Sequence, residues 1–239
     1  MRLFHKAAGP AALLLAAAAL GACTAGSFRP QTLAKTDIDL VADRSIAILE
    51  RQLRELTIKL YRRNPRELQK RRGATLDARL HQLFSQPGEL SFGELDNRQS
   101  TDAIQLAFDE NYTGDRVFAV MAGLTDMLRR SYGYKAEYFV LDELDQQKLY
   151  NSARNVEILV WRLSQRRDSE GRLFLLTNEM TETGPSTGLR TGVDNLSFER
   201  LFGKMIAVQD LMAEITADST QRTINRVVQG AASMIFLPI

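Results

Sequence analysis

The sequence predicts a mainly α-helical protein, a multi-helix bundle of about seven or eight helices with at most one small strand pairing. Two long segments carry apolar residues at alternating spacings of about three and four, which is the period of a helix. Most of the other segments begin at a capping residue and end at glycine or proline. No period of about 20 to 50 residues repeats convincingly, so a helical solenoid is not predicted.

The first long helix is expected from residue 46 onwards, and its apolar stripe consists of Ile46, Leu49, Leu53, Leu56 and Leu60. The second spans residues 145–167 and repeats the spacing with Leu149, Ala153, Val156, Val160 and Leu163. Each stripe needs an apolar partner, so we expect the two helices to pack against each other.

Shorter helices are expected around these two. Asn64 and Pro65 start one in a capping-box pattern with Glu67, and Gly73 ends it. Candidate N-caps for four further helices are Thr75 (through Phe84), Ser100 or Thr101 (through about Glu110), Asp115 (ended at Gly133) and Ser197. A last helix is expected over about residues 220–233. Residues 173–176 are the one strand candidate, and residues 177–196 are expected to form a loop.

The N-terminal segment combines the basic residues Arg2 and Lys6, an apolar run from Ala11 to Leu20, and small residues before the only cysteine. Its end, Leu20-Gly21-Ala22-Cys23, resembles the lipobox of bacterial lipoproteins. The resemblance implies that the chain is cleaved before Cys23 and that Cys23 carries the lipid. The alternative is an uncleaved membrane helix over residues 7–23, but this segment barely reaches the lower limit of about 17 residues and Gly9-Pro10 interrupts it.

In such lipoproteins an aspartate directly after the cysteine favours retention in the inner membrane, and here that position is Thr24. The resemblance therefore implies the inner leaflet of an outer membrane, facing the periplasm. Residues 1–22 would be the cleaved signal peptide, residues 23–42 the lipidated N-terminus with a flexible tether, and residues 43–239 a single helical periplasmic domain.

Composition excludes several kinds of chemistry. Acylation of Cys23 would leave the mature chain without a thiol, so no disulfide and no cysteine nucleophile is expected. His81 is the only histidine beyond the signal segment, which excludes a zinc site with several imidazoles, and its helical setting beside Leu80 and Leu83 favours a packed or surface role. Neither a metal nor a cofactor is predicted.

Without Arg2 and Lys6, the 31 basic residues fall to 29, which equals the 29 acidic residues. A balanced total charge gives no support for binding to nucleic acid.

One motif imitates a catalytic site. Residues 184–188, Gly-Pro-Ser-Thr-Gly, match the G-x-S-x-G nucleophile elbow of serine hydrolases. The elbow requires a strand before it, a helix after it and a later histidine as general base. No histidine follows His81, and residues 189–192 do not start a helix, so a loop is predicted instead.

A second candidate is the acidic group Asp142, Glu143 and Asp145, which could hold a cation or supply an acid and a base. The position of Asp145 is also where the following helix needs an N-cap. Asp142 and Glu143 precede the positive end of the same helix, which they would stabilise. We therefore expect a structural role for this group.

Charge is unevenly distributed. Residues 43–72 contain ten basic and four acidic residues, whereas residues 89–145 contain five basic and twelve acidic ones. The basic segment could face anionic head groups and the acidic one a basic partner, or the two could neutralise each other within the fold or both be solvated. Aromatic residues near 132–139 could line a ligand groove or pack in the core. The candidate interaction residues are Arg62, Arg63, Arg66, Lys70, Arg71, Arg72, Tyr132, Tyr134 and Tyr138.

The function favoured by the sequence is a membrane-anchored lipoprotein that binds or scaffolds an envelope protein without catalysis. Two alternatives remain. A cell-wall hydrolase using carboxylates would need a pocket with two of them about 5–9.5 Å apart. A carrier of an apolar ligand would need an apolar cavity of several hundred Å³. The apolar residues 234–239 are expected to dock in a groove of their own domain, the alternative being presentation to a partner.

Overall fold

The computed structural model describes residues 35–178, 180–181, 192–193, 196–226 and 234–239. In this part of the chain there are seven α-helices, one short 3-10 helix and two paired strands of two residues each. Residues Thr36–Ile239 form one compact unit. The prediction of a mainly helical bundle with at most one small strand pairing is confirmed.

Helix α2 (Asp37–Arg63) begins earlier than predicted. Thr36 and Asp39 form a capping box, in which the Asp39 N–H donates to Thr36 Oγ1 over 3.2 Å and the Thr36 N–H donates to Asp39 Oδ2 over 2.7 Å. The apolar stripe continues backwards through Ala42, which is buried, and Ile38, which packs against the core. A domain boundary at residue 43 is therefore wrong, because residues 37–42 belong to this helix and not to a tether.

Three short α-helices follow: α3 (Pro65–Gln69), α4 (Leu76–Phe84) and α5 (Ser100–Leu106), with the 3-10 helix η2 (Gly93–Leu95) before α5. Thr75 caps α4 as predicted, by accepting from the Ala78 N–H. Pro65 stands at the start of α3 as predicted, but the Asn64 side chain makes no capping bond there. Helix α5 ends four residues before the expected Glu110, and its N-cap is Gln99, not Ser100 or Thr101.

Helix α6 (Arg116–Ser131) lies at the centre of the unit, and all of its residues except Arg129 and Arg130 are buried. Asp115 caps it as predicted, by accepting from the Phe118 N–H over 2.9 Å. Helix α5 crosses it closely at Gly123, where a Cβ atom would overlap the backbone oxygen of Ser100. The contact therefore requires glycine at this position.

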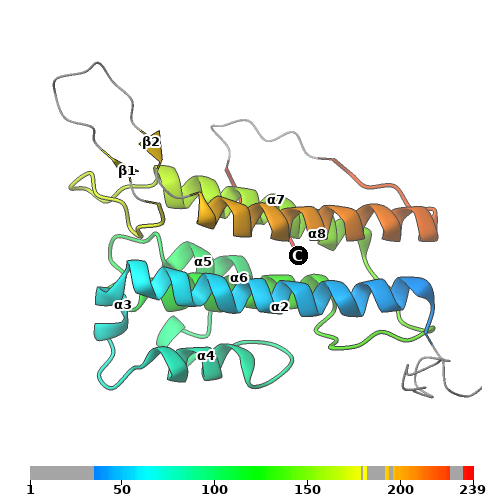
Figure 1. Cartoon of the computed structure of the whole chain (residues 1–239), viewed down its shortest axis with the longest axis horizontal. Coiled ribbons are helices and arrows are strands. Elements are labelled where there is room, and N and C mark those ends of the chain that lie inside the picture. Colours follow the sequence, from blue (N-terminus) through cyan, green and yellow to red (C-terminus); the bar gives the residue numbers. More distant parts are fainter. Residues whose placement is uncertain (1–34, 179, 182–191, 194–195, 227–233) are drawn as a thin grey trace, which may run out of the picture. The chain divides into compact units, whose positions relative to one another are not determined.

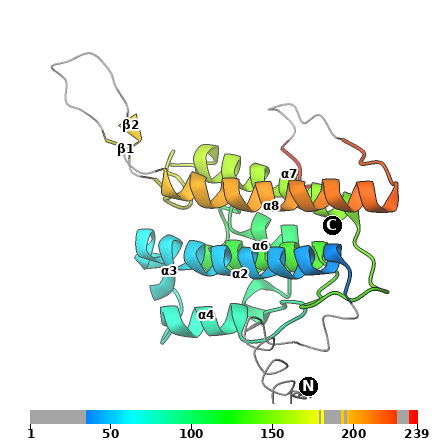
Figure 2. The same cartoon turned by 45° about the vertical axis from the view of Figure 1, so that its right-hand side comes forward.

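Helices α7 (Gln146–Gln165) and α8 (Ser197–Thr220) lie side by side above α2, α5 and α6, with α4 below that layer (Figures 1 and 2). Asp145 caps α7 as predicted. The expected pairing of the α2 and α7 stripes is wrong, because α7 packs mainly on α8, and α2 packs on α8, α6 and α4. Buried residues of α8, among them Phe202, Met205 and Met212, provide the apolar surface between them.

Two predictions in the C-terminal half need correction. Leu173 makes only an isolated bridge with Arg167, and the paired strands are β1 (Met180–Thr181) and β2 (Gly192–Val193). Residues 173–176 cannot continue as a strand, because the backbone of Leu176 is bound by the Asn64 side chain.

The predicted helix over residues 220–233 is also wrong for its described part. Helix α8 itself extends to Thr220 and ends where Gln221 adopts a left-handed conformation with φ of 53°, and residues 222–226 are not helical. Residues 227–233 lie outside the described residues, as do residues 184–188 of the G-x-S-x-G motif.

Helix α8 starts at Ser197 with Leu196 as its N-cap, so Ser197 is not the cap.

The C-terminal residues 234–239 dock on α7, as predicted. The Asn155 side chain holds both backbone groups of Leu237, accepting from its N–H over 2.6 Å and donating to its oxygen over 2.8 Å. Arg162 donates to the Met234 oxygen and stacks 4.4 Å from the ring centre of Phe236. No helix among the described residues is long and apolar enough to cross a membrane.

Candidate functional site: an open charged cleft

An open cleft with a volume of about 870 Å³ lies where the C-terminal end of α2, helix α3, the first residue of α6 and residues 168–176 meet. Charged side chains of both signs line it: Arg63, Arg66, Glu67, Glu110, Arg116, Asp168, Glu170 and Arg172. Apolar residues of the 168–176 segment form part of its wall. We treat this open cleft as the candidate site, because it is concave and charged groups of both signs line it.

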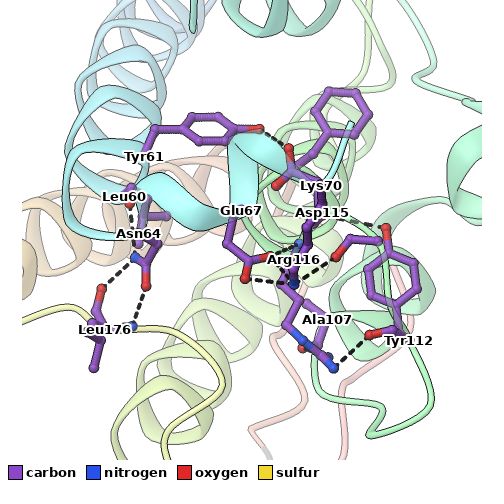
Figure 3. A network of polar contacts seen from close by, with 12 residues as sticks. Leu60, Tyr61, Asn64, Glu67, Lys70, Ala107, Tyr112, Asp115, Arg116 and Leu176 are labelled. Carbon is purple, nitrogen blue, oxygen red and sulfur yellow. Dashed lines mark hydrogen bonds and ion pairs between the residues drawn. The ribbon is translucent and has the colours of Figure 1, made fainter. Parts of the chain in front are cut away.

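Asn64 positions one wall of the cleft. Its side-chain Nδ2 donates to the Leu60 oxygen over 2.9 Å and to the Leu176 oxygen over 2.8 Å, and its Oδ1 accepts from the Leu176 N–H over 2.8 Å. The bonds are visible at the left of Figure 3. A single amide therefore ties the segment before β1 to the end of α2.

Glu67 and Arg116 join α3 to α6 at the base of the cleft. Glu67 Oε2 accepts from the Arg116 backbone N–H over 2.7 Å, and its carboxylate also pairs with Lys70 (Figure 3). The Arg116 guanidinium donates to the backbone oxygens of Ala107, Asp109 and Tyr112, each over 2.7 Å. Both side chains are therefore engaged in holding the protein together.

A buried ionic network lies beneath α3. Arg79, whose side chain is 1% exposed, donates to both carboxylate oxygens of Glu94 over 2.7 and 3.0 Å and to Asp115 Oδ2 over 3.0 Å. Its guanidinium stacks 3.9 Å from the ring centre of Phe118. The hydroxyl of Tyr61 donates to the same oxygen of Asp115 over 2.8 Å. Asp115 thus caps α6 and accepts from α2 and α4 at once.

Burial and pairing oppose each other in this network. Burial would raise the pKa of Glu94, but hydrogen bonds from Arg79 and Arg71 outweigh it and hold that pKa below its ordinary value. Burial raises the pKa of Asp115, against the bonds that it accepts from Phe118, Tyr61 and Arg79. Burial also raises the pKa of Tyr61, and the neighbouring Asp115 adds to this rise. The phenol therefore remains a donor to the carboxylate.

The carboxylates of the cleft do not form an arrangement typical of acid catalysis. A hydrogen bond from the Arg172 N–H lowers the pKa of Asp168, whereas a general acid needs a raised pKa. Asp168 shapes its own turn by accepting from the N–H groups of Glu170 and Arg172. Glu170 pairs with Arg172 over 2.8 Å. The geometry of the cleft suits the binding of a charged group by the charged side chains at its rim.

The predicted basic residues lie together at this end of α2. Arg62, Arg66 and Arg72 are exposed and make no ion pair with another described residue. Lys70 pairs with Glu67, and Arg71 pairs with Glu94 over 2.6 Å. The Arg71 pair joins the basic segment to the acidic one, so part of the predicted charge separation is neutralised within the fold. We call Arg62, Arg66 and Arg72 the exposed arginines.

The predicted tyrosines are elsewhere. Tyr132 and Tyr138 are only 2% and 1% exposed and pack edge to face with ring centres 6.4 Å apart, which matches the core-packing alternative. The Tyr138 N–H donates to Asp43, nineteen residues before Arg62 on α2, or about 28 Å along the helix. Tyr134 is half-buried and its hydroxyl donates to Asp126. The structure does not bring the tyrosines to the basic residues.

The acidic group at 142–145 has the structural role expected of it. Asp145 caps α7, and Asp142 accepts from the Phe139 N–H and pairs with Lys135. No group of three or more histidine, cysteine, aspartate or glutamate side chains suited to a metal occurs among the described residues. His81 is exposed on α4.

Sequence reasoning missed the central ionic network. Asp115 was predicted only as a cap, and Arg79 stands in a short amphipathic helix where a charged side chain is normally solvated. The two residues are 36 positions apart, so no local spacing indicates that they meet.

The fold and the cleft together define a helical bundle with an open charged site and a buried ionic network at one end. A comparison of the chain with models of protein families, with curated proteins and with solved structures gave no match.

Proposed function

We propose that the chain is a bacterial lipoprotein, anchored through Cys23 to the inner leaflet of the outer membrane and facing the periplasm, where it binds or scaffolds an envelope protein without catalysis. The observation that carries the proposal is the lipobox Leu20-Gly21-Ala22-Cys23 behind a basic start and an apolar run. The folded unit begins at Thr36, thirteen residues beyond Cys23. Such a short connection would keep the domain at its membrane, and no nucleic acid or cofactor has a place in this proposal.

The exposed arginines support the binding part of the proposal. They extend over the last turn of α2, helix α3 and the turn after it, beside the open cleft. Arg62 is in the last turn of α2 and Arg66 in the last turn of α3, where a positive charge also interacts favourably with the helix dipole. Arginine is nevertheless favoured at interfaces, because its planar guanidinium binds carboxylates in a bidentate manner. A partner with an acidic surface fits this end of the domain best.

The two alternatives have less support. A hydrolase based on carboxylates would use the cleft, where Glu67 and Asp168 are already engaged in holding the fold. A carrier of an apolar ligand would need a large apolar cavity, and the apolar pocket between α2 and α6, beside Leu49 and Leu128, holds about 50 Å³. That volume is far below the range of about 300–1,000 Å³ for ligand pockets.

Site-specific crosslinking in intact cells tests the binding role. A photo-reactive residue at Arg66 should capture one specific envelope protein, and the same residue at Arg200, exposed on α8, should not. Charge reversal of the exposed arginines to glutamate should abolish the capture, since the contact is electrostatic. Charge reversal of Arg44, Arg51 and Arg200, which are also exposed, is the matched control and should preserve it. Equal capture at Arg66 and Arg200, or capture unaffected by the reversal, would rule out this binding surface.

A further inference from the structure

Exposed apolar side chains gather at the other end of α2. Nine large apolar residues are exposed in the described part of the chain, and five of them belong to only two short segments. Leu40 and Val41 are in the first turns of α2, and Phe139, Val140 and Leu141 are in the connection between α6 and α7. We call these five residues the tether-end apolar surface.

The two segments are neighbours. The Tyr138 N–H donates to Asp43 Oδ1 over 2.8 Å, and Asp43 is one helical turn after Leu40. Figures 1 and 2 both show the connection between α6 and α7 beside the N-terminal end of α2. The five apolar residues therefore lie at the same end of the domain.

The connection is built so that its apolar tip faces outwards. The Asp142 N–H donates to the Phe139 oxygen over 2.7 Å, and Asp142 Oδ2 accepts from the Phe139 N–H over 2.9 Å, which closes a tight turn. Tyr138 fixes the turn to the core, because its ring is buried and its hydroxyl donates to the Tyr132 oxygen. With both ends of the turn held, the Leu141 side chain is 92% exposed.

This surface is at the point where the N-terminal segment enters the folded unit. The thirteen residues from Cys23 to Thr36 reach at most about 45 Å even when fully extended. Helix α2 places its other end about 40 Å further away. A lipid on Cys23 would therefore hold the N-terminal end of α2 within about 45 Å of the bilayer and keep it, on average, nearer to the bilayer than the cleft.

We propose that the tether-end apolar surface rests on the bilayer, with the tip at Phe139–Leu141 inserted about 5–10 Å into the interface as amphipathic membrane-binding segments are. The inference rests on the proposed lipid anchor and adds the orientation of the domain, with the cleft directed away from the membrane. Around this surface Lys135 is paired with Asp142 and Arg222 with Glu143, and Asp37 adds a negative charge, so zwitterionic head groups fit it better than anionic ones.

Depth-dependent quenching on the full-length lipoprotein tests the inference. Leu141→Cys, carrying an environment-sensitive dye, is reconstituted in phosphatidylcholine vesicles that contain lipids with a nitroxide near the head group or deep in the acyl chain. Leu176→Cys is the matched control, because Leu176 is also exposed and is bound by Asn64 at the opposite end of α2. We expect the shallow nitroxide to quench the dye at Leu141 more strongly than the deep one does, and the dye at Leu176 to remain unquenched by either.

The anchor is checked separately on the chain without added cysteine, since an acylated Cys23 has no thiol for a dye. If Cys23 is acylated and the dye at Leu141 is not quenched, the bilayer contact is wrong although the anchor stands. The same conclusion follows if the dye at Leu141 is shielded only when envelope proteins are added. If Cys23 reacts with the dye and no lipid is attached, both the proposed function and the bilayer contact are wrong. Stronger quenching when phosphatidylglycerol is included would overturn the choice of zwitterionic lipid.

Discussion

The two ends of helix α2 use charge and apolar surface in opposite ways. At the C-terminal end, charged side chains are drawn inside: Arg79 is buried between Glu94 and Asp115, and Arg116 is bonded to three backbone oxygens. At the N-terminal end, apolar side chains are left outside, with Leu141 almost fully exposed on a well-fixed turn. The difference indicates that the buried charged residues at the cleft end hold the fold, whereas an exposed apolar side chain such as Leu141 at the tether end contributes little to folding.

The largest effect is expected at the cleft end. Arg79→Ala should lower the free energy of unfolding by about 3–5 kcal/mol, because it leaves Asp115 as a buried charge without its cationic partner. Denaturant unfolding of the chain without residues 1–23 measures this change. Arg71→Ala is the matched control: Arg71 pairs with the same Glu94 but is half exposed, so its loss should cost at most about 1 kcal/mol. Equal losses of stability in the two variants would contradict the expected difference between a buried ion pair and a surface ion pair.

The docked C-terminal tail shows what an apolar segment does when it is used for folding. Deletion of residues 234–239 removes the partly buried Phe236 and Ile239 from the core and the backbone bonds held by Asn155. We expect a loss of about 2–3 kcal/mol, which corresponds to a melting temperature roughly 5–10 °C lower. Differential scanning calorimetry on the same chain measures it. Unchanged melting together with the loss of a crosslinked partner would mean that the tail is an interaction motif.

Acid should weaken the cleft end through Glu94. Its pKa in the folded protein is below the ordinary value of 4.5, so its stabilising contribution is complete above that pH and is lost as the pH falls through the folded-state pKa. The contribution of Asp115 to stability changes with pH in the opposite direction, because burial raises its pKa and its protonation at low pH favours the folded state. The comparison of wild type with Glu94→Gln isolates the first effect, and the advantage of the wild type should shrink below pH 4.5. Parallel stability curves for the two proteins at acid pH would show that Glu94 has no such role.

The smallest effect on stability is expected at the tether end. Leu141→Ser should change the free energy of unfolding by no more than about 0.5 kcal/mol, because the side chain is already exposed. Urea unfolding of the variant beside wild type provides the test. A loss comparable to that of the tail deletion would mean that Leu141 packs in the folded domain and is not a contact residue.

Local patterns in the sequence predicted the helices well where a single side chain sets a boundary. Thr75, Asp115 and Asp145 each accept the capping bonds expected of them, and Pro65 starts its helix. The start of α2 was missed because residues 24–42 taken together mix small, polar and proline positions, which hides the capping box of Thr36 and Asp39. The 173–176 segment has the composition of a strand, but among the described residues it makes only the bridge between Leu173 and Arg167, and Asn64 binds the backbone of Leu176.

The candidate site was predictable only in part. The basic residues 62–72 were found from charge alone, because a run of arginines at a helix end is visible in the sequence. The network of Arg79, Glu94 and Asp115 joins three separate segments, so its members resemble ordinary surface charges until the fold is known. The tether-end apolar surface likewise depends on the contact between Asp43 and Tyr138, which are 95 positions apart.

The most direct test of the account is lipid attachment at Cys23. Cells that express the full chain or Cys23→Ala are grown with a fatty-acid analogue, and the label on each protein is measured together with the size of the chain. We predict that the wild type is labelled and shortened, and that Cys23→Ala is unlabelled and remains at precursor length, because no other residue can form the thioether. Normal labelling of Cys23→Ala, or an unlabelled wild type, would contradict the anchor and with it the orientation of the domain at the membrane.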